Sequence, residues 1–274
     1  MKIVIAVDSF KGSATSKEVS EYIEDGINNV CKDFLIKKVA IADGGEGTVE
    51  AIVDSTSGKY IFEEVHGPLG AMVKARYGII NENIAVMEMA EASGINLVKR
   101  EELNPFKTST YGVGEVLKSI LDKGIREIYI GVGGSATNDG GAAGGLGYAL
   151  LSVCQAEFKE GIIEIMNLIS LEERLKDADL VITGEGRIDN QSICGKAPVG
   201  IAKMAKKYNI PVIAIVGSSA RNLEEIYKNG IDLVLDIINE PMDLDKAIKD
   251  VKELLEFTGE KAIRAFLVGK VINK

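Results

Sequence analysis

The sequence contains no tryptophan and a single histidine, His66. A Ser-His-Asp triad would have to be built on that one imidazole, which precedes a Gly-Pro turn, so a carboxylate is the expected general base instead. The three cysteines lie far apart and form no Cys-x-x-Cys pair. Their spacing argues against a disulfide framework or a zinc site and favours a reducing compartment.

Long hydrophobic runs and clusters of basic residues are also missing. No apolar run approaches the roughly 18 residues of a membrane span, and the apolar start at 2–7 is too short for a signal peptide. The net charge is −9, with 32 basic and 41 acidic residues. Nucleic-acid binding is disfavoured because it depends on Lys and Arg that neutralise phosphates. We therefore predict a cytoplasmic protein that binds neither membranes nor nucleic acids.

The familiar nucleotide motifs are absent or incomplete. The segment nearest to a Walker A motif, 190–197 (NQSICGKA), lacks the leading Gly and the closing Ser or Thr. Residues 131–136 (GVGGSA) match G-x-G-x-x-A after a predicted strand. However, no second strand precedes an acidic residue about 20 positions further on, as a dinucleotide site requires. An NAD(P)-dependent oxidoreductase is thus an alternative that rests on this motif alone.

What the chain does contain is 30 glycines and an alternation of apolar strands with amphipathic helices. Strands are predicted at 2–7, 37–42, 127–132, 179–183, 212–216 and 232–235, and antiparallel strands within 59–90. Helices are predicted after a Thr15–Glu18 capping box and over 112–123, 141–154 and 244–257. This order predicts an α/β fold with a Rossmann-like (flavodoxin-like) parallel-sheet domain, 1–58 plus 175–274, interrupted by a smaller inserted α+β domain, 59–174.

Acidic residues follow several of these strands, in glycine-rich turns. They are Asp8, Asp43, Glu46, Asp139, Glu185 and Asp189. The carboxyl ends of parallel strands form the ligand crevice of an open sheet, where glycine amides bind phosphate and carboxylates bind Mg²⁺ or accept a proton. One such residue alone is as readily a helix cap or a turn former. Together they indicate phosphate and metal chemistry.

Seven segments carry a family resemblance: DSFKGS (8–13), ADGGEGT (42–48), GPLG (67–70), TSTYGVGE (108–115), GGSATNDGG (133–141), ITGEGRIDNQS (182–192) and GKAPVGIA (195–202). In this order they resemble the signature segments of the bacterial type of glycerate kinase. The resemblance implies a two-domain α/β fold and transfer of the ATP γ-phosphoryl group to D-glycerate with Mg²⁺. The implied site comprises Asp8, Ser9, Lys11, Asp43, Glu46, Ser135, Asn138, Asp139, Glu185, Arg187, Asp189 and Lys196.

The chemistry of phosphoryl transfer suggests roles for most of these residues, because the reaction needs positioning and charge neutralisation. Basic residues would bind phosphates and the substrate carboxylate, and Asp189 or Asp8 would accept the hydroxyl proton. Catalytic roles are predicted for Asp189, Asp8, Lys11 and Arg187. ATP binding is predicted for Gly133, Gly134, Ser135, Asn138, Asp139 and Lys196. Magnesium binding is predicted for Asp43, Glu46 and Glu185.

The chain departs from the family at one point. In relatives a segment about the size of a small domain separates GGSATNDGG from a later GAGAAGGLG motif, whereas here the two are joined within 133–147. We therefore expect a shortened inserted domain in a folded protein, and Mg-ATP binding that is better preserved than glycerate turnover. The alternative is a regulatory relative that binds nucleotide or an anion without turnover. The oligomeric state, homo-oligomer included, and the 2- or 3-phosphate product are left open.

Overall fold

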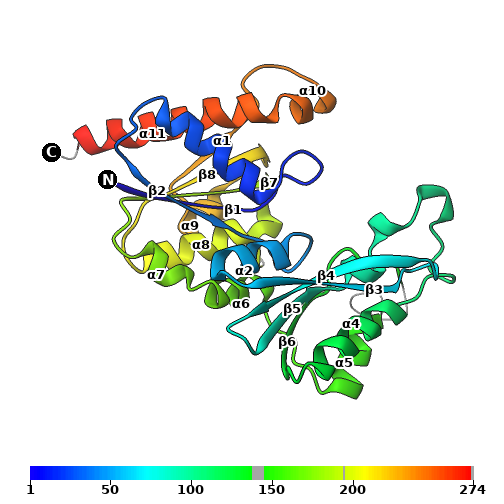
Figure 1. The fold of residues 1–274 in the computed structure, drawn as a ribbon. Coiled ribbons are helices and arrows are strands. Elements are labelled where there is room, and N and C mark those ends of the chain that lie inside the picture. The colour runs from blue at the N-terminus through cyan, green and yellow to red at the C-terminus, as the bar shows by residue number, and fades with distance from the viewer. Residues whose placement is uncertain (138–144, 194, 273–274) are drawn as a thin grey trace. The chain divides into compact units, whose positions relative to one another are not determined.

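The computed structural model describes residues 1–137, 145–193 and 195–272, and it contains two units, each with its own sheet (Figure 1). The first unit comprises Met1–Asp43 and Ile162–Lys274, and the second comprises Gly44–Gly161. The domain boundaries expected after residues 58 and 174 stay a prediction. Within the described ranges, no helix has the length and apolarity that crossing a membrane requires.

A five-stranded parallel sheet forms the centre of the first unit. Its order is β2 (Leu35–Ala40), β1 (Lys2–Val7), β7 (Leu180–Ile188), β8 (Val212–Ser219) and β9 (Leu233–Asp236). In β1, Val7 lies opposite Ala40 on one side and Gly184 on the other. The prediction that the first two strands share one parallel sheet with those near 180 and 212 is confirmed. The carboxyl ends of β1, β2 and β7 therefore lie at one edge.

Helices cover both faces of this sheet (Figure 1). On one face, α1 (Ser16–Asn28) and α11 (Val251–Ile272) pack on the alternate side chains Ile3 and Ile5 of β1. On the other face, α8 (Ala197–Lys206) contacts β1, β7 and β8. The shorter helices are α6 (Gly161–Leu168), α7 (Leu171–Leu175), α9 (Glu224–Lys228) and α10 (Leu244–Lys249). The predicted capping box at the start of α1 is present, with Thr15 and Glu18 bonded to each other's backbone N–H.

The C-terminal tail differs from its predicted form. The sequence suggested one helix over 244–257, but α10 ends before Asp250 and a separate helix, α11, continues to Ile272. Asp250 leaves the helical conformation, donates its N–H to the carbonyl of Lys246 and accepts the N–H of Leu254, so it ends one helix and begins the next. The extension beyond Phe257 is stabilised because Ala262 and Ile263 are buried in the core.

A mixed four-stranded sheet forms the second unit. Its order is β3 (Lys59–His66), β4 (Met72–Ile80), β5 (Ile84–Glu88) and β6 (Glu127–Gly131). The first three strands are antiparallel, as predicted, and β6 runs parallel to β5. Within this unit, α4 (Tyr111–Asp122) and α5 (Leu146–Cys154) bury one face around Tyr77, while α2 (Thr48–Thr56) packs on β4 and β5. The predicted helix start at 141 lies outside the described residues.

Candidate active site

Asp8 lies at the first bend after β1 and is largely buried. Its backbone N–H donates to the carbonyl of Gly184 at 3.0 Å, which fixes the residue to the neighbouring strand β7. Only 8% of its surface is exposed. Burial raises the pKa of Asp8 to about 6, and the charge of Asp43 adds to the effect, whereas Ser9 and Lys11 oppose it. A buried carboxyl group with a raised pKa therefore directly follows the first strand.

The turn after Asp8 lies against β7. A Cβ atom on Gly186 would be 3.9 Å from the backbone N of Lys11 and from the Cα of Phe10, so the turn reaches the strand at that point. The side chain of Lys11 is exposed, and its charge acts on Asp8. Asp43, after β2, also acts on Asp8 electrostatically. The segments that follow β1 and β2 thus bring two carboxylates and one ammonium group within electrostatic range of one another.

Glu185 points from β7 towards the loop before α8. Its Oε2 is 3.0 Å from Lys196 Nζ, and Lys196 also approaches the carbonyl of Arg187 at 3.4 Å. The Glu185 side chain is only 10% exposed. Burial raises the pKa of this carboxyl group, and Ser192 and Lys196 oppose the rise. Its second oxygen, Oε1, is buried and has no hydrogen-bond partner among the described residues.

Asp189 directly follows β7 and is held by the backbone. Its Oδ1 accepts the N–H of Gln191 at 2.9 Å, and its own N–H donates to Ser192 Oγ at 3.2 Å. Its Oδ2 is 3.4 Å from Arg187 Nε, a long ion pair at an exposed guanidinium group. The Asp189 carboxylate therefore lies close enough to Glu185 to act on it electrostatically, while the Arg187 guanidinium pairs with Asp189.

Strand β7 extends further than the sequence pattern predicts. Glu185 was expected just after a strand that ends at Thr183, but it lies inside β7, which continues to Ile188. The strand is longer because its last residues pair with the end of β8, where Arg187 lies opposite Ser218. Successive side chains of a strand point to opposite faces, so Glu185 and Arg187 share one face and Gly186 lies between them.

The remaining predicted residues belong to the second unit. Glu46 is exposed in the loop between β2 and α2. Gly133, Gly134 and Ser135 follow β6, and the carbonyl of Gly134 accepts the N–H of Ile95 at 2.8 Å. Ser135 Oγ and Thr137 Oγ1 are 3.0 Å apart. Asn138 and Asp139 lie outside the described residues.

The glycine pattern after β6 has a steric cause. A Cβ atom on Gly131 would be 2.7 Å from the carbonyl O of Gly44, and one on Gly133 would be 2.9 Å from the Cα of Gly45. Both distances are shorter than real Cβ contacts allow. Glycine is needed at both positions because another loop of the same unit lies against this backbone. The G-x-G-x-x-A match thus has an explanation that involves no dinucleotide.

The two halves of the chain match one family. The model of the glycerate kinase family matches residues 3–143 and 140–267. The chain belongs to the glycerate kinase family. The two matched stretches overlap at 140–143, within the glycine-rich segment 133–147.

Individual glycerate kinases align with nearly the whole length of this chain. The chain is 33% identical to a glycerate kinase of Bacillus subtilis (strain 168), an alignment that covers 99% of each chain. It is 33% identical to the glycerate 2-kinase of Escherichia coli (strain K12), with 91% of this chain and 93% of the relative covered. The first alignment spans 379 positions, more than the 274 residues here, so it contains positions of the relative without a counterpart.

A solved structure matches this glycerate kinase family member as well. It is the crystal structure of a candidate glycerate kinase 2 from Salmonella typhimurium LT2, with a TM-score of 0.83 and 33% sequence identity. The match covers 98% of this chain and 99% of that one. The α/β fold with one parallel and one mixed sheet is therefore the fold of this family.

A magnesium ion is compatible with the residues of the first unit. Mg²⁺ prefers carboxylate oxygens and keeps several water ligands, so one or two protein carboxylates suffice. The Oε1 of Glu185, which is buried and has no hydrogen-bond partner within the described ranges, is an oxygen of that kind. The described ranges contain no group of three or more His, Cys, Asp or Glu side chains that would hold a metal ion by themselves. The predicted ligands Asp43, Glu46 and Glu185 stay a prediction.

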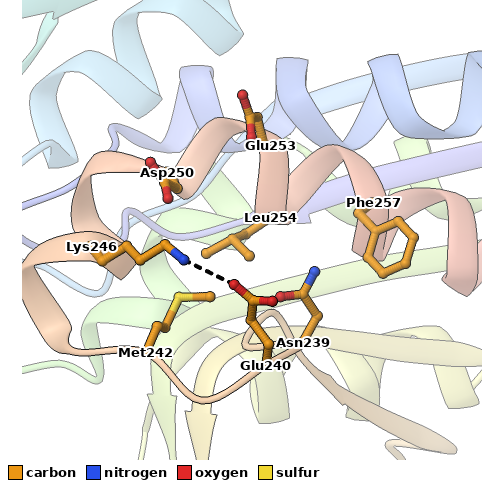
Figure 2. A pocket seen from close by; sticks show the side chains of 8 residues that line it. All are labelled: Asn239, Glu240, Met242, Lys246, Asp250, Glu253, Leu254 and Phe257. Carbon is orange, nitrogen blue, oxygen red and sulfur yellow. Dashed lines mark hydrogen bonds and ion pairs between the residues drawn. The ribbon is translucent and has the colours of Figure 1, made fainter.

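A pocket of about 350 Å³ in the first unit is lined by other residues (Figure 2). It lies between α10, α11 and the segment before them. Lys246 in its wall is 2.9 Å from Glu240 Oε1, and Asp250 and Glu253 add two more carboxylates. None of the predicted site residues lines this pocket. Its acidic walls are unsuited to a phosphate group because like charges repel.

Proposed function

We propose that this protein transfers the γ-phosphoryl group of ATP to D-glycerate in the cytoplasm. Membership of the glycerate kinase family carries the proposal. Two groups of charged residues in the first unit support it, Asp8 with Lys11 and Asp43, and Glu185 with Asp189 and Lys196. Carboxylates and basic groups that follow the strands of a parallel sheet suit a phosphorylated ligand.

In the proposed reaction a hydroxyl oxygen of D-glycerate attacks the γ-phosphorus, and the bond from that phosphorus to the β-phosphate oxygen breaks. ADP is the leaving group. The hydroxyl proton passes to a carboxylate, for which Asp189 and Asp8 are the two candidates. Asp8 has the more buried side chain, while Asp189 lies beside the Arg187 guanidinium group.

Lysines and arginine would stabilise the charge on the transferred group. We assign this role to Lys11 and Arg187, whose side chains are exposed, and to Lys196, which is held by Glu185. Bound Mg²⁺ would neutralise the β- and γ-phosphates. Glu185, Asp43 and Glu46 are its proposed ligands, and Gly133–Ser135 with Asn138 and Asp139 are the proposed contacts for ATP.

A coupled ADP-release assay over a panel of hydroxy-acids tests the proposal. We expect D-glycerate to be the best acceptor, with kcat/KM below the ordinary enzyme range of about 10⁴–10⁸ M⁻¹s⁻¹ because a block of the family's sequence is missing. ADP release that is independent of every acceptor would contradict the proposed function. A value inside the ordinary range would show that the missing block is dispensable.

A further inference from the structure

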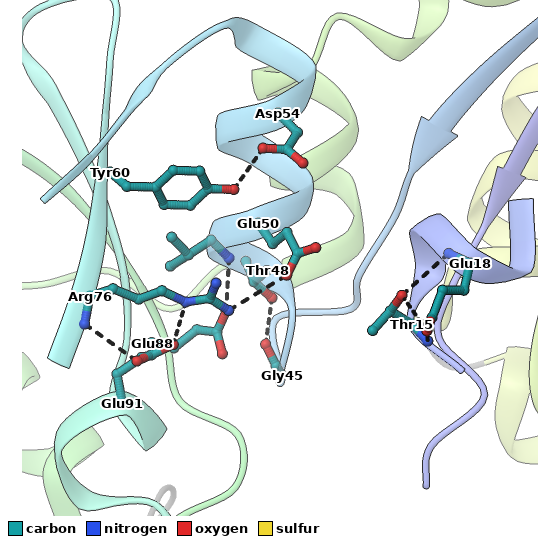
Figure 3. Close-up of polar contacts among 11 residues, drawn as sticks. Thr15, Glu18, Gly45, Thr48, Glu50, Asp54, Tyr60, Arg76, Glu88 and Glu91 are labelled. Atoms are coloured by element: carbon teal, nitrogen blue, oxygen red, sulfur yellow. Dashed lines mark hydrogen bonds and ion pairs between the residues drawn. The ribbon is translucent and has the colours of Figure 1, made fainter. Parts of the chain in front are cut away.

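Glu88, which no motif marks, is a buried carboxylate at the end of β5. Only 4% of its surface is exposed, and its Oε1 accepts the backbone N–H of Val49 at 2.8 Å. The N–H of Gly47 also bonds to this carboxylate. Figure 3 shows the side chain beneath the first turn of α2. A residue 39 positions away in the sequence therefore binds the free N–H groups at the start of that helix.

The helix α2 depends on this contact because it has no side-chain cap of its own. Its N-cap residue is Gly47, in a left-handed conformation with φ of 90° and no side-chain hydrogen bond. A Ser, Thr, Asn or Asp at that position would ordinarily supply the acceptor. Glu88 supplies it here, and its negative charge lies at the positive end of the helix dipole.

The loop before α2 is held from a second side as well. Glu88 lies opposite Gly131 in the parallel pair of β5 and β6. The backbone around Gly131 and Gly133 leaves no room for a Cβ atom beside Gly44 and Gly45. Within the loop, Thr48 Oγ1 donates to the carbonyl of Gly45 at 2.7 Å. The segment 44–47, which carries Glu46, is thus fixed between a buried carboxylate and a glycine backbone.

The charged side chains near Glu88 form ion pairs with one another. Arg76 on β4 places its Nε 2.7 Å from Glu91 Oε1 and its Nη2 3.6 Å from Glu50 Oε2 (Figure 3). Burial raises the pKa of Glu88 to about 7, Glu91 adds to the rise, and Val49, Arg76 and Gly47 oppose it. Direct hydrogen bonds to the ionised form of Glu88 thus come from the loop and the helix start.

We propose that Glu88 is a positioning residue of the kinase reaction, which holds the 44–47 loop so that Glu46 can serve bound Mg²⁺. The inference rests on the proposed function. Glu88 itself is too deeply buried to touch a substrate. Groups that orient the ligands of a metal ion typically contribute about 10- to 100-fold to metal affinity or activity.

The test compares Glu88→Gln and Glu88→Ala in the full-length chain with Glu50→Gln as the matched control. Glu50 lies in the first turn of α2 and, within the part of the chain that the structure describes, is paired with Arg76 and not with the backbone of 44–47. Its replacement therefore removes the same charge at the start of the same helix and leaves the Glu88 contact in place. The first readout is amide hydrogen exchange of peptides that cover 44–52. We expect faster exchange there, by at least about tenfold for Glu88→Ala, and exchange like that of the wild type for Glu50→Gln.

The second readout separates positioning from a purely structural role. For Glu88→Gln, which is nearly isosteric, we expect the half-saturating Mg²⁺ concentration to rise by about 10- to 100-fold while KM for glycerate stays within about twofold. A structural defect would instead lower the amount of active enzyme and leave the Mg²⁺ dependence unchanged. Unchanged exchange over 44–52, or faster exchange with an unchanged Mg²⁺ dependence, would overturn the inference.

A wild-type chain without turnover would mean that the proposed function, and not the role of Glu88, has failed. Calorimetric titration with Mg-ATP then takes the place of the rate measurement. We expect Glu88→Gln to weaken Mg-ATP binding by about 10- to 100-fold. Equal affinities of Glu88→Gln and the wild type for Mg-ATP would overturn the role of Glu88.

Discussion

Lys196 and Glu185 form a partly buried ion pair, with 3.0 Å between Nζ and Oε2. The lysine stands at the N-cap of α8 and the glutamate lies within β7, so the pair joins a helix start to the central sheet. The second carboxylate oxygen of Glu185, Oε1, has no hydrogen-bond partner in the described part of the chain. The pair thus occupies only one of the two oxygens of Glu185.

Replacing Lys196 by Met should leave the Glu185 charge buried without its partner. We expect a loss of about 1–3 kcal/mol in the free energy of unfolding and a loss of at least about tenfold in kcat/KM for ATP. Urea unfolding and steady-state kinetics measure the two effects. Lys203→Met is the control, since Lys203 is exposed on the same helix. Equal free energies of unfolding and equal kcat/KM values for the two variants would contradict the proposed roles of Lys196 in stability and ATP binding.

Asp8 should make stability depend on pH in a defined window. Its pKa is about 6 in the folded protein and near 3.8 ordinarily. Between these values the unfolded chain has released the proton and the folded chain retains it, so rising pH favours unfolding. Asp8 therefore lowers the free energy of unfolding progressively from about pH 4 to pH 6, by about 2–3 kcal/mol in all, and the loss stays constant above that range.

The variant Asp8→Asn should consequently be more stable than the wild type at pH 7.5, by up to about 2 kcal/mol, and similar to it near pH 4. Urea unfolding at several pH values without Mg²⁺ measures the difference. Asp33→Asn, at an exposed position, should show no such trend. A stabilisation by Asp8→Asn that is the same at every pH would show that burial of the charge is not its cause.

Gly133→Ala should disturb the contact between two loops of the second unit. The new Cβ would be 2.9 Å from the Cα of Gly45, so one backbone segment must move. We expect a destabilisation of about 1–3 kcal/mol, measured by urea unfolding, together with lower activity. The control is Gly114→Ala in α4, where no atom lies within 4 Å of the added Cβ. That change should stabilise the helix by roughly 0.5–1 kcal/mol.

Asp189→Asn tests the choice of general base. If Asp189 accepts the hydroxyl proton, kcat should fall by roughly 10²–10⁴ with little loss of stability. Stability should persist because the amide oxygen can still accept the N–H of Gln191. Asp245→Asn, at an exposed position in α10, provides the matched control. A near-normal kcat for Asp189→Asn would remove Asp189 from this role and leave Asp8.

Local sequence patterns were sufficient for much of the fold. The run KIVIAV predicted β1 because its side chains are buried on both faces of a parallel sheet. The Thr15–Glu18 capping box predicted the start of α1, since both partners lie within one turn. The placement of acidic residues after β1 and β2 likewise indicated Asp8 and Asp43, because the strand order brings those ends to one edge.

The features that escaped prediction depend on contacts between distant segments. Glu88 caps a helix that begins far from it in the sequence, so no local motif marks it. The length of β7 depends on pairing with β8, and that of α11 on burial against α1. Gly131 and Gly133 resembled a dinucleotide motif because close approach of another backbone requires the same residue type.

The central claim is that this chain phosphorylates glycerate, and ³¹P NMR of a reaction with ATP, Mg²⁺ and D-glycerate tests it most directly. We expect a phosphomonoester signal from phosphoglycerate that grows in equal amount with ADP, is absent without glycerate, and distinguishes the 2- from the 3-phosphate. The same sample with Asp189→Asn or Lys196→Met should produce it more slowly. Binding of Mg-ATP without any phosphoglycerate, or ADP formation that glycerate does not change, would contradict the account.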